Sequence, residues 1–280
     1  MRLGQGERSA IPIMLFLAIG FAAPLLAVIW FGFLPPRSFS LAGAPSLENY
    51  RTIFEGTNYI SFLWSLSLAA VAMLLLAVIC YPVAYGLVRV FGRWSLLLTL
   101  LFTIPLFVSE NIRLYGWVLF LIKNGVLLGT LKSMFGVELE SMLFSLPAII
   151  LGMVYVYLPF MLFPMTLGIG MVPDETCDAA SDLGASRWQV FTEVELPLSM
   201  PGVVIGFLLT FVLAVGAIAE AKVLGGQQVI PIAHDIEIAF TYAQNWPLGA
   251  ALSVLLMLVV GVLVLLALRR FDLDRFLGRR

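Results

Sequence analysis

Long apolar stretches separated by short polar segments are the dominant pattern along this chain of 280 residues. Six such stretches stand out, at about residues 11–34, 62–88, 95–109, 143–170, 201–219 and 248–268. Most of them reach the roughly 20 apolar residues that an α-helix needs to cross a bilayer. The third stretch is shorter, and the partly apolar residues 112–122 could complete it. The pattern predicts an all-α, polytopic membrane protein with six transmembrane helices.

The composition leaves no room for a separate soluble domain. Hydrophobic residues make up 61% of the chain and charged residues only 12%, which is too little charge to cover a soluble domain of this size. We therefore expect residues 1–280 to form a single transmembrane domain in contact with the lipid bilayer. The net charge of −1 gives no reason to expect a nucleic-acid partner. Cys80, Cys177 and His234 lack the spacing of a metal site, so we expect no bound metal.

The basic residues predict the orientation of the chain. With six spans both termini lie on the same side, and ten of the 16 Lys and Arg residues fall on that side. Loops rich in Lys and Arg stay in the cytoplasm, so we expect both termini there.

The first stretch follows Arg2 and Arg8 as the apolar core of a signal peptide would, but its apolar run exceeds the about 7–15 residues of such a core. We therefore expect residues 11–34 to be a retained first span.

Residues 173–200 interrupt the apolar pattern with a polar, acidic segment, which lies on the cytoplasmic side in this topology. Its acidic residues are Asp174, Glu175, Asp178, Asp182, Glu193 and Glu195. An acidic residue at the centre of a bilayer costs about 2.5–3.5 kcal/mol on insertion scales. Six of them exclude insertion, so we expect this segment to be a loop outside the membrane.

Local signals predict that this loop is a helical hairpin. Pro173 and the two acids after it suit the first turn of a helix, where acids offset the positive end of the helix dipole. Gly184 suits the end of that helix, and Ser186 with Gln189 forms the capping box of a second helix. Such a hairpin could simply brace the membrane bundle, or it could be a docking surface for another protein.

The second helix carries apolar residues at helical spacing, among them Trp188 and Phe191. We expect these two side chains to pack back against the membrane bundle. Pro197 and Pro201 follow, and we expect them to end this helix before the next span begins.

The hairpin resembles a known signature. It reads Asp178-Ala179-Ala180, then Gly184 after three residues, then Val194 and Leu196-Pro197. This spacing is similar to that of the EAA loop in the permease subunits of binding-protein-dependent ABC importers. Two departures, Asp for Glu at position 178 and Val for Ile at position 194, are conservative. With the order of its spans, the chain therefore resembles the type I (MetI-like) importer permeases over a core of residues 60–268.

The resemblance implies a role for the hairpin. In that family the hairpin docks into a cleft of the ATP-binding subunit and transmits the ATP-driven closure of the ATPase to the membrane spans. The resemblance assigns ATPase coupling to Asp178, Ala179, Ala180, Asp182, Leu183, Gly184, Ala185 and Ser186. It also implies two ATP-binding subunits, a second permease subunit in a heterodimer, an extracytoplasmic solute-binding protein and the bacterial inner membrane. The chain has no Walker phosphate-binding loop. ATP and Mg²⁺ would therefore belong to the partner subunits, and the chain itself would be no enzyme and need no cofactor.

Shorter runs resemble the polyamine (spermidine/putrescine) group of these permeases, at residues 113–117, 123–125, 224–226 and 245–252. One departure weakens the resemblance to the polyamine group. Those permeases usually carry Asp after the glycine near the end of the fifth span, whereas Ala217 follows Gly216 here. Aminophosphonates, opines, thiamine, sulfate and ferric iron stay open as substrates, because related permeases carry them.

Charged and aromatic residues near the outer side form a candidate substrate path. They are Glu110, Arg113, Tyr115, Trp117, Glu220 and Trp64. Carboxylates attract a cationic amine, and an aromatic face adds about 0.5–2 kcal/mol of cation–π attraction. The same residues fit an ordinary explanation, because Trp and Tyr form belts at membrane interfaces and Arg113 can pair with Glu110 one helical turn away.

Two other function classes fit the chain less well. An intramembrane enzyme would need a catalytic pair or a metal cluster at membrane depth, and the predicted spans hold almost no ionisable residues and no histidine. An ion-coupled secondary transporter would be expected to show intramembrane acids and internal repeats, and it would leave the hairpin unexplained. The energy source, ATP hydrolysis or an ion gradient, separates these classes.

Overall fold

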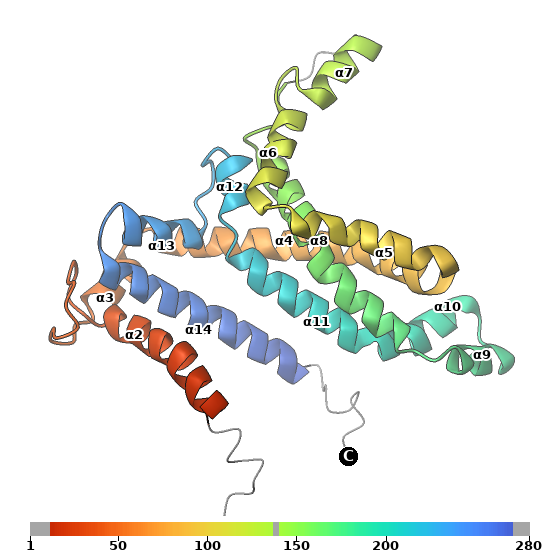
Figure 1. Ribbon diagram of the computed structural model, residues 1–280, viewed down its shortest axis with the longest axis horizontal. Coiled ribbons are helices and arrows are strands. Elements are labelled where there is room, and N and C mark those ends of the chain that lie inside the picture. The colour runs from red at the N-terminus through yellow and green to blue at the C-terminus, as the bar shows by residue number, and fades with distance from the viewer. Residues whose placement is uncertain (1–11, 137–139, 271–280) are drawn as a thin grey trace, which may run out of the picture. The chain divides into compact units, whose positions relative to one another are not determined.

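The computed structural model describes residues 12–136 and 140–270. Arg2, Arg8, residue 11 of the expected first span and the basic tail after Arg270 lie outside the described residues. All regular secondary structure in the described residues is helical (Figure 1).

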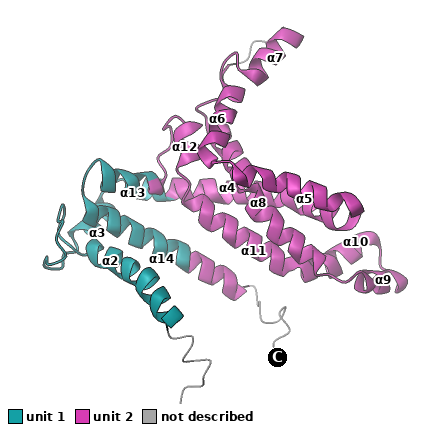
Figure 2. Cartoon of the chain, viewed as in Figure 1, with its two compact units in different colours: residues 1–62, 234–261 teal, residues 63–233, 262–280 magenta. Residues whose placement is uncertain are grey.

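The helices form two compact units (Figure 2), residues 1–62 with 234–261 and residues 63–233 with 262–280. Unit 1 contains η1 (Ala18–Ala22), α2 (Ala23–Gly32), α3 (Glu48–Glu55) and parts of α4 (Asn58–Tyr85), α13 (Ile232–Thr241) and α14 (Trp246–Arg270). Unit 2 contains the rest of these three helices, η2 (Gly86–Val90), η3 (Gly92–Trp94), α5 (Ser95–Thr103), η4 (Ile104–Phe107), α6 (Glu110–Leu121), α7 (Val126–Phe135), α8 (Leu146–Gly170), α9 (Asp174–Asp182), α10 (Arg187–Gln189), η5 (Val190–Glu195), α11 (Leu196–Val215) and α12 (Ala219–Val223). That the chain is one domain stays a prediction.

Six stretches of the described residues are long and apolar enough to cross a membrane, as the sequence predicts. They are Pro12–Gly32, Asn58–Val90, Glu110–Phe135, Leu146–Gly170, Arg187–Val215 and Trp246–Arg270. The third candidate differs from the predicted one, because residues 95–109 fall largely in a shorter apolar helix, Gly92–Phe107. Non-helical backbone at Val108 and Ser109 separates that helix from α6. Glu110 therefore begins a candidate span instead of ending one.

The expected outer loops also contain helices. Residues 35–60 include α3, residues 110–142 include α6 and α7, and residues 220–247 include α13 and most of α12. Helices α3, α12 and α13 are short, whereas α6 and α7 together form one of the six candidate spans, Glu110–Phe135.

In unit 2, α8 and α11 pack along their length through small residues. A Cβ atom on Gly202 would overlap the carbonyl oxygen of Pro164 and the Cα of Gly168. A Cβ on Gly206 would lie 3.0 Å from the carbonyl oxygen of Met161. Small residues at these positions let membrane helices approach closely, which gives dispersion contacts where no hydrophobic force acts between helices.

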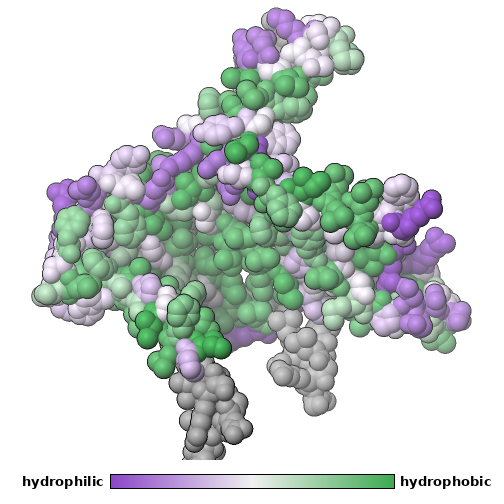
Figure 3. Space-filling model, viewed as in Figure 1, coloured by the Kyte–Doolittle hydropathy of each residue, from purple (hydrophilic) through white to green (hydrophobic). Residues whose placement is uncertain are grey.

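The surface of the spans is apolar and the hairpin is not (Figure 3). On α4, for example, Leu74 and Val78 are 58% and 74% exposed. Figure 3 shows hydrophilic residues gathered at the α9–α10 hairpin. Exposed apolar side chains on long helices fit a surface that faces lipid.

In unit 1, hydrogen bonds from asparagine side chains join the helix ends. The buried amide of Asn49 on α3 donates to the carbonyl oxygens of Gly32 and Leu34, at 3.3 and 2.7 Å. These oxygens lie at the end of α2, where helical carbonyls lack partners within the helix. Asn58 at the start of α4 donates to Asp235 of α13 at 3.1 Å.

Candidate functional site

The predicted helical hairpin is present, and its corner has a defined hydrogen-bond pattern. Helix α9 begins at Asp174, directly after Pro173. Gly184 has φ of +90°, which residues with a side chain rarely adopt. The N–H groups of Gly184 and Ala185 donate to the carbonyl oxygens of Ser181 and Ala180, at 2.9 and 3.1 Å. This is the Schellman pattern of helix ends, so Gly184 forms the corner as the sequence predicts.

The capping box of the second arm is also confirmed. The hydroxyl of Ser186 accepts from the Gln189 N–H at 3.3 Å, and the Gln189 side chain accepts from the Ser186 N–H at 2.8 Å.

The expected helix end at Pro197 and Pro201 is wrong. The chain stays helical from Arg187 through η5 and α11 to Val215. The π-helical segment η5 ends at Glu195, two residues before Pro197. A proline disturbs the regular i→i−4 hydrogen bonds of the preceding turn, and a π-helical turn accommodates such a disturbance without ending the helix. The second arm of the hairpin therefore continues into a candidate span without a break.

The hairpin presents an exposed surface, which we call the hairpin tip: Asp178, Asp182, Leu183, Gly184 and Trp188. Leu183 is 90% exposed and Trp188 is 71% exposed, so the expectation that Trp188 packs against the bundle is wrong. The half-buried Phe191 does pack there, with its ring 5.7 Å from that of Tyr81 on α4. The Trp188 ring lies 5.4 Å from the Phe191 ring. An exposed Leu and Trp beside two carboxylates have the composition of a protein-docking surface.

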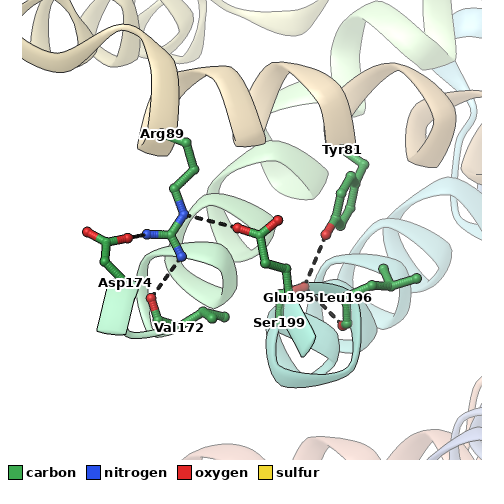
Figure 4. Close-up of polar contacts among 7 residues, drawn as sticks. All are labelled: Tyr81, Arg89, Val172, Asp174, Glu195, Leu196 and Ser199. Atoms are coloured by element: carbon green, nitrogen blue, oxygen red, sulfur yellow. Dashed lines mark hydrogen bonds and ion pairs between the residues drawn. The ribbon is translucent and has the colours of Figure 1, made fainter. Parts of the chain in front are cut away.

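Arg89 in η2, at the end of the second candidate span, holds both ends of the hairpin (Figure 4). Its guanidinium pairs with Asp174, the first residue of α9, and donates to the carbonyl oxygen of Val172 at 2.9 Å. Its Nε lies 3.5 Å from Oε1 of Glu195, the last residue of η5. We call these four residues the Arg89 clamp.

The two ion pairs of the Arg89 clamp differ in strength. The side chains of Arg89 and Glu195 are 16% and 9% exposed, so water screens this pair little and the loss of one partner would leave a buried charge. The side chain of Asp174 is 80% exposed, and exposed pairs contribute little to stability. The pair of Arg89 with Glu195 is therefore the stronger attachment.

Sequence reasoning missed the Arg89 clamp. It treated Arg89 only as a basic residue at a span end and Glu195 only as one of the loop acids. Arg89 and Asp174 are 85 residues apart in the chain, and no local pattern reports such a contact. A second contact of this kind joins the Tyr81 hydroxyl to Oγ of the buried Ser199 on α11, at 3.3 Å.

Three of the six residues of the candidate substrate path line two cavities in unit 2. Glu110 lines a cavity of about 380 Å³ together with Tyr157 of α8 and the chain between α11 and α12. Arg113 and Trp117 line a second cavity of about 330 Å³ with Phe120 and Tyr155. Trp64 and Tyr115 are exposed residues that line neither of these cavities. Tyr157 was not predicted, since a tyrosine within an apolar span carries no specific signal.

Arg113 contacts an aromatic ring and not Glu110. Its guanidinium lies 5.7 Å from the centre of the Tyr155 ring, which also contacts the ring of Trp117 at 5.6 Å. Nε and Nη1 of Arg113 are buried without a hydrogen-bond partner among the described residues. The alternative in which Arg113 pairs with Glu110 is therefore wrong.

Glu220 is fully buried, and neither carboxylate oxygen has a hydrogen-bond partner among the described residues. This burial, together with the negative charge of Glu110, raises the pKa of Glu220 above its ordinary value. The neighbouring Tyr157 hydroxyl and Arg113 guanidinium act in the opposite direction. The structure thus brings Glu110 and Arg113 close enough to Glu220 to act on its pKa.

Replacing Glu220 by Gln is expected to stabilise the protein in detergent at about pH 8, because it removes a buried, unpaired carboxylate. Since the pKa is raised in the folded state, wild-type stability falls as the pH rises from the ordinary glutamate value of 4.5 through the raised value. A glutamine does not titrate, so the melting temperature of the variant should exceed that of wild type by about 2–4 °C at the higher pH and match it at acidic pH. The exposed Glu48→Gln is the control, and parallel pH profiles of wild type and Glu220→Gln would contradict the burial argument.

Comparison with known proteins agrees with the predicted family of importer permeases. Residues 56–275 match the family described as "Binding-protein-dependent transport system inner membrane component". Over 244 residues the chain is 33% identical to the spermidine/putrescine transport system permease protein PotB of Haemophilus influenzae, covering 86% of this chain and 85% of that protein. It is also 33% identical over 221 residues to PotB of Escherichia coli, covering 79% and 80% of the two chains.

Solved structures show the same fold. A crystal structure of a bacterial ABC transporter that imports the acidic polysaccharide alginate matches with a TM-score of 0.73 at 19% identity, covering 94% of each chain. A structure of the alginate transporter in complex with an alginate pentasaccharide-bound periplasmic protein also gives a TM-score of 0.73, at 17% identity, covering 97% of this chain and 94% of that one. At these identities the likeness concerns the fold alone.

Proposed function

Because this chain belongs to the family of binding-protein-dependent transport system inner membrane components, we propose that it forms the substrate path of an ATP-driven importer and couples that path to ATPase subunits. The chain is an inner-membrane ABC importer permease with a MetI-like fold and six candidate spans. Its relatives are transport permeases, so its task is movement of a solute.

The attachment of the hairpin at both ends is the observation that carries the coupling role. Arg89 joins the start of α9 and the end of η5 to the second candidate span, and the second arm runs without a break into α11. A displacement of the tip therefore reaches the spans, whereas a flexible loop would absorb it. In this proposal Leu183 and Trp188 enter an apolar cleft of the ATPase, and Asp178 and Asp182 meet its basic or N–H groups.

The partners follow from this role. Two ATPase subunits bind ATP and Mg²⁺ and dock at the hairpin, with both termini of this chain in the cytoplasm. A second permease subunit completes the path, and an extracytoplasmic solute-binding protein delivers the substrate. A periplasmic protein bound to the alginate transporter of the same fold supports this arrangement.

For the substrate we propose a polyamine or a related small organic cation. Two observations support it: the relatives named for spermidine and putrescine transport, and the cavity that Glu110 lines beside the buried Glu220. Aminophosphonates, opines, thiamine and ferric iron are the alternatives within the same importer class.

A panel of solutes tests this function. The complex, reconstituted in liposomes with its solute-binding protein, is expected to hydrolyse ATP faster with spermidine or putrescine than with the alternative solutes. Stimulation by another solute alone would retain the importer and change the substrate. Uptake that needs an ion gradient and no ATP would contradict the proposal and indicate a secondary transporter.

The hairpin tip gives a second test. Replacing both Leu183 and Trp188 by Ser is expected to release the ATPase subunits, because it removes the exposed apolar side chains that would fill the cleft. The amount of ATPase that co-purifies with the permease should fall at least tenfold, a loss of about 1.4 kcal/mol in binding. Thr176→Ala, on an exposed residue of α9, is the control, and unchanged co-purification of the double variant would exclude the tip as the docking surface.

A further inference from the structure

Two helix interruptions meet around one cavity of unit 2. The chain leaves helical conformation between Phe107 and Glu110, and again between α11 and α12. The cavity of about 380 Å³ lies between these breaks and is lined by Glu110, Asn111, Tyr157, Leu213, Gly216, Ala217, Ile218 and Ala219. The 20-residue α11 ends there, so the partial negative charge of its last carbonyl groups lies at the cavity. Interrupted helices that leave carbonyl groups at a cavity are a known way to hold cations in membrane proteins.

A buried tyrosine lines this cavity, and a buried carboxylate without a hydrogen-bond partner among the described residues lies beside it. Tyr157 is only 6% exposed and lines the cavity. Ala217 lines both this cavity and the small one beside the fully buried Glu220, so Glu220 lies directly behind the first cavity. Buried acceptors of this kind are costly unless a donor reaches them.

Arg113 is the positive charge already present near these acids. Helices α6, α8 and α12 meet at Gly152, where an added Cβ would lie 3.4 Å from a methyl carbon of Leu114 and 3.5 Å from Cγ of Glu220. Arg113 adjoins Leu114 on α6, yet its guanidinium contacts the Tyr155 ring and its Nε and Nη1 have no hydrogen-bond partner among the described residues. When both carboxylates are ionised, these three side chains together carry one net negative charge. One further cation would neutralise it.

We propose that this cavity binds one alkylammonium group of the substrate, with Glu110 and Tyr157 as direct contacts and Glu220 as the buried charge behind them. Arg113 is the resident cation with which the substrate competes. The proposal rests on the proposed function, which makes the chain an importer of organic cations. An ammonium group has only donors, and this cavity offers carboxylate, hydroxyl and carbonyl oxygens to accept from it.

The test is equilibrium binding of putrescine to the purified permease–ATPase complex without the solute-binding protein. Glu110→Gln and Glu220→Gln are each expected to raise the dissociation constant about tenfold, the effect of losing one charged contact. Arg113→Gln is expected to lower it several-fold, because it removes the competing cation. Butane-1,4-diol, which has the same length without charge, should not compete. Exposed Glu48→Gln is the matched control.

The direction of the Arg113 effect separates this site from general damage, since a structural defect would weaken binding in all variants. If ATP-driven putrescine uptake is normal but the three variants bind like wild type, or all bind more weakly, the cavity is not the site and the proposed function stands. If the wild-type complex neither binds nor takes up any amine, both the site and the cationic substrate are wrong.

Discussion

Replacing Gly184 by Asp is expected to leave the protein inserted in the membrane and to abolish transport. Gly184 has φ of +90° at the corner of the hairpin, and left-handed backbone costs a residue with a side chain about 1–2 kcal/mol. The added carboxylate also lies at the C-terminal end of α9, where a negative charge opposes the helix dipole. The corner should open, and ATP hydrolysis should no longer drive uptake in proteoliposomes.

Gly184→Asn separates the two causes. Asparagine adopts positive φ more readily than most residues and adds no charge, so this variant should retain more transport than Gly184→Asp. The space around Gly184 is open, with nothing within 4 Å of an added Cβ, so neither effect comes from a steric clash. Full transport by Gly184→Asp at normal expression would refute the importance of the corner.

Replacing Arg89 by Gln is expected to uncouple ATP hydrolysis from transport, with a smaller loss of protein stability. The change frees both ends of the hairpin and leaves Glu195 buried without its charged partner. Removing one partner of a buried ion pair costs about 3–5 kcal/mol of stability. Because Arg89 and Glu195 are partly exposed and water screens their charges, we expect a cost of about 3 kcal/mol or less. The number of solutes transported per ATP, measured on the same proteoliposomes, should fall at least tenfold.

A double variant isolates the cause of the Arg89 effect. Adding Glu195→Gln to Arg89→Gln removes the unpaired charge and should restore most of the melting temperature, but not the coupling, because the hairpin stays detached. Arg187→Gln is the matched control, since Arg187 is an exposed arginine at the start of α10. Normal coupling in Arg89→Gln would show that the spans receive the displacement through α11 alone.

The hairpin could be predicted because its signals are local. The glycine corner and the Ser186–Gln189 capping box involve residues that are at most five positions apart, and each has a defined hydrogen-bond pattern. The number of spans could be predicted for a similar reason, because each span must be apolar along its whole length.

The features that were missed depend on contacts between distant parts of the chain. The apolar run at 95–109 has the composition of a span, but the helix within it is short and the chain is interrupted before Glu110. Trp188 has the spacing of a core residue, yet it lies outside the bundle because Phe191 occupies the position against Tyr81. Hydropathy reports how apolar a residue is and cannot tell whether it faces the bundle or a partner.

The candidate substrate path was predicted by residue type and only partly by position. Carboxylates are rare in this chain, so Glu110 and Glu220 were found, whereas Trp64 and Tyr115 line neither cavity. Tyr157 could not be selected from the sequence, since its burial next to Glu220 depends on how α8 packs against α12.

The most direct test of the central claim, that an ATPase docks on the hairpin tip, is photo-cross-linking from position 183. A photo-reactive amino acid in place of the exposed Leu183 is expected to capture the ATPase subunit in the assembled complex. The same amino acid in place of Tyr242, which is 80% exposed in the region expected outside, should capture no ATPase. Capture of the ATPase from position 242 and not from position 183 would contradict both the docking surface and the orientation of the chain.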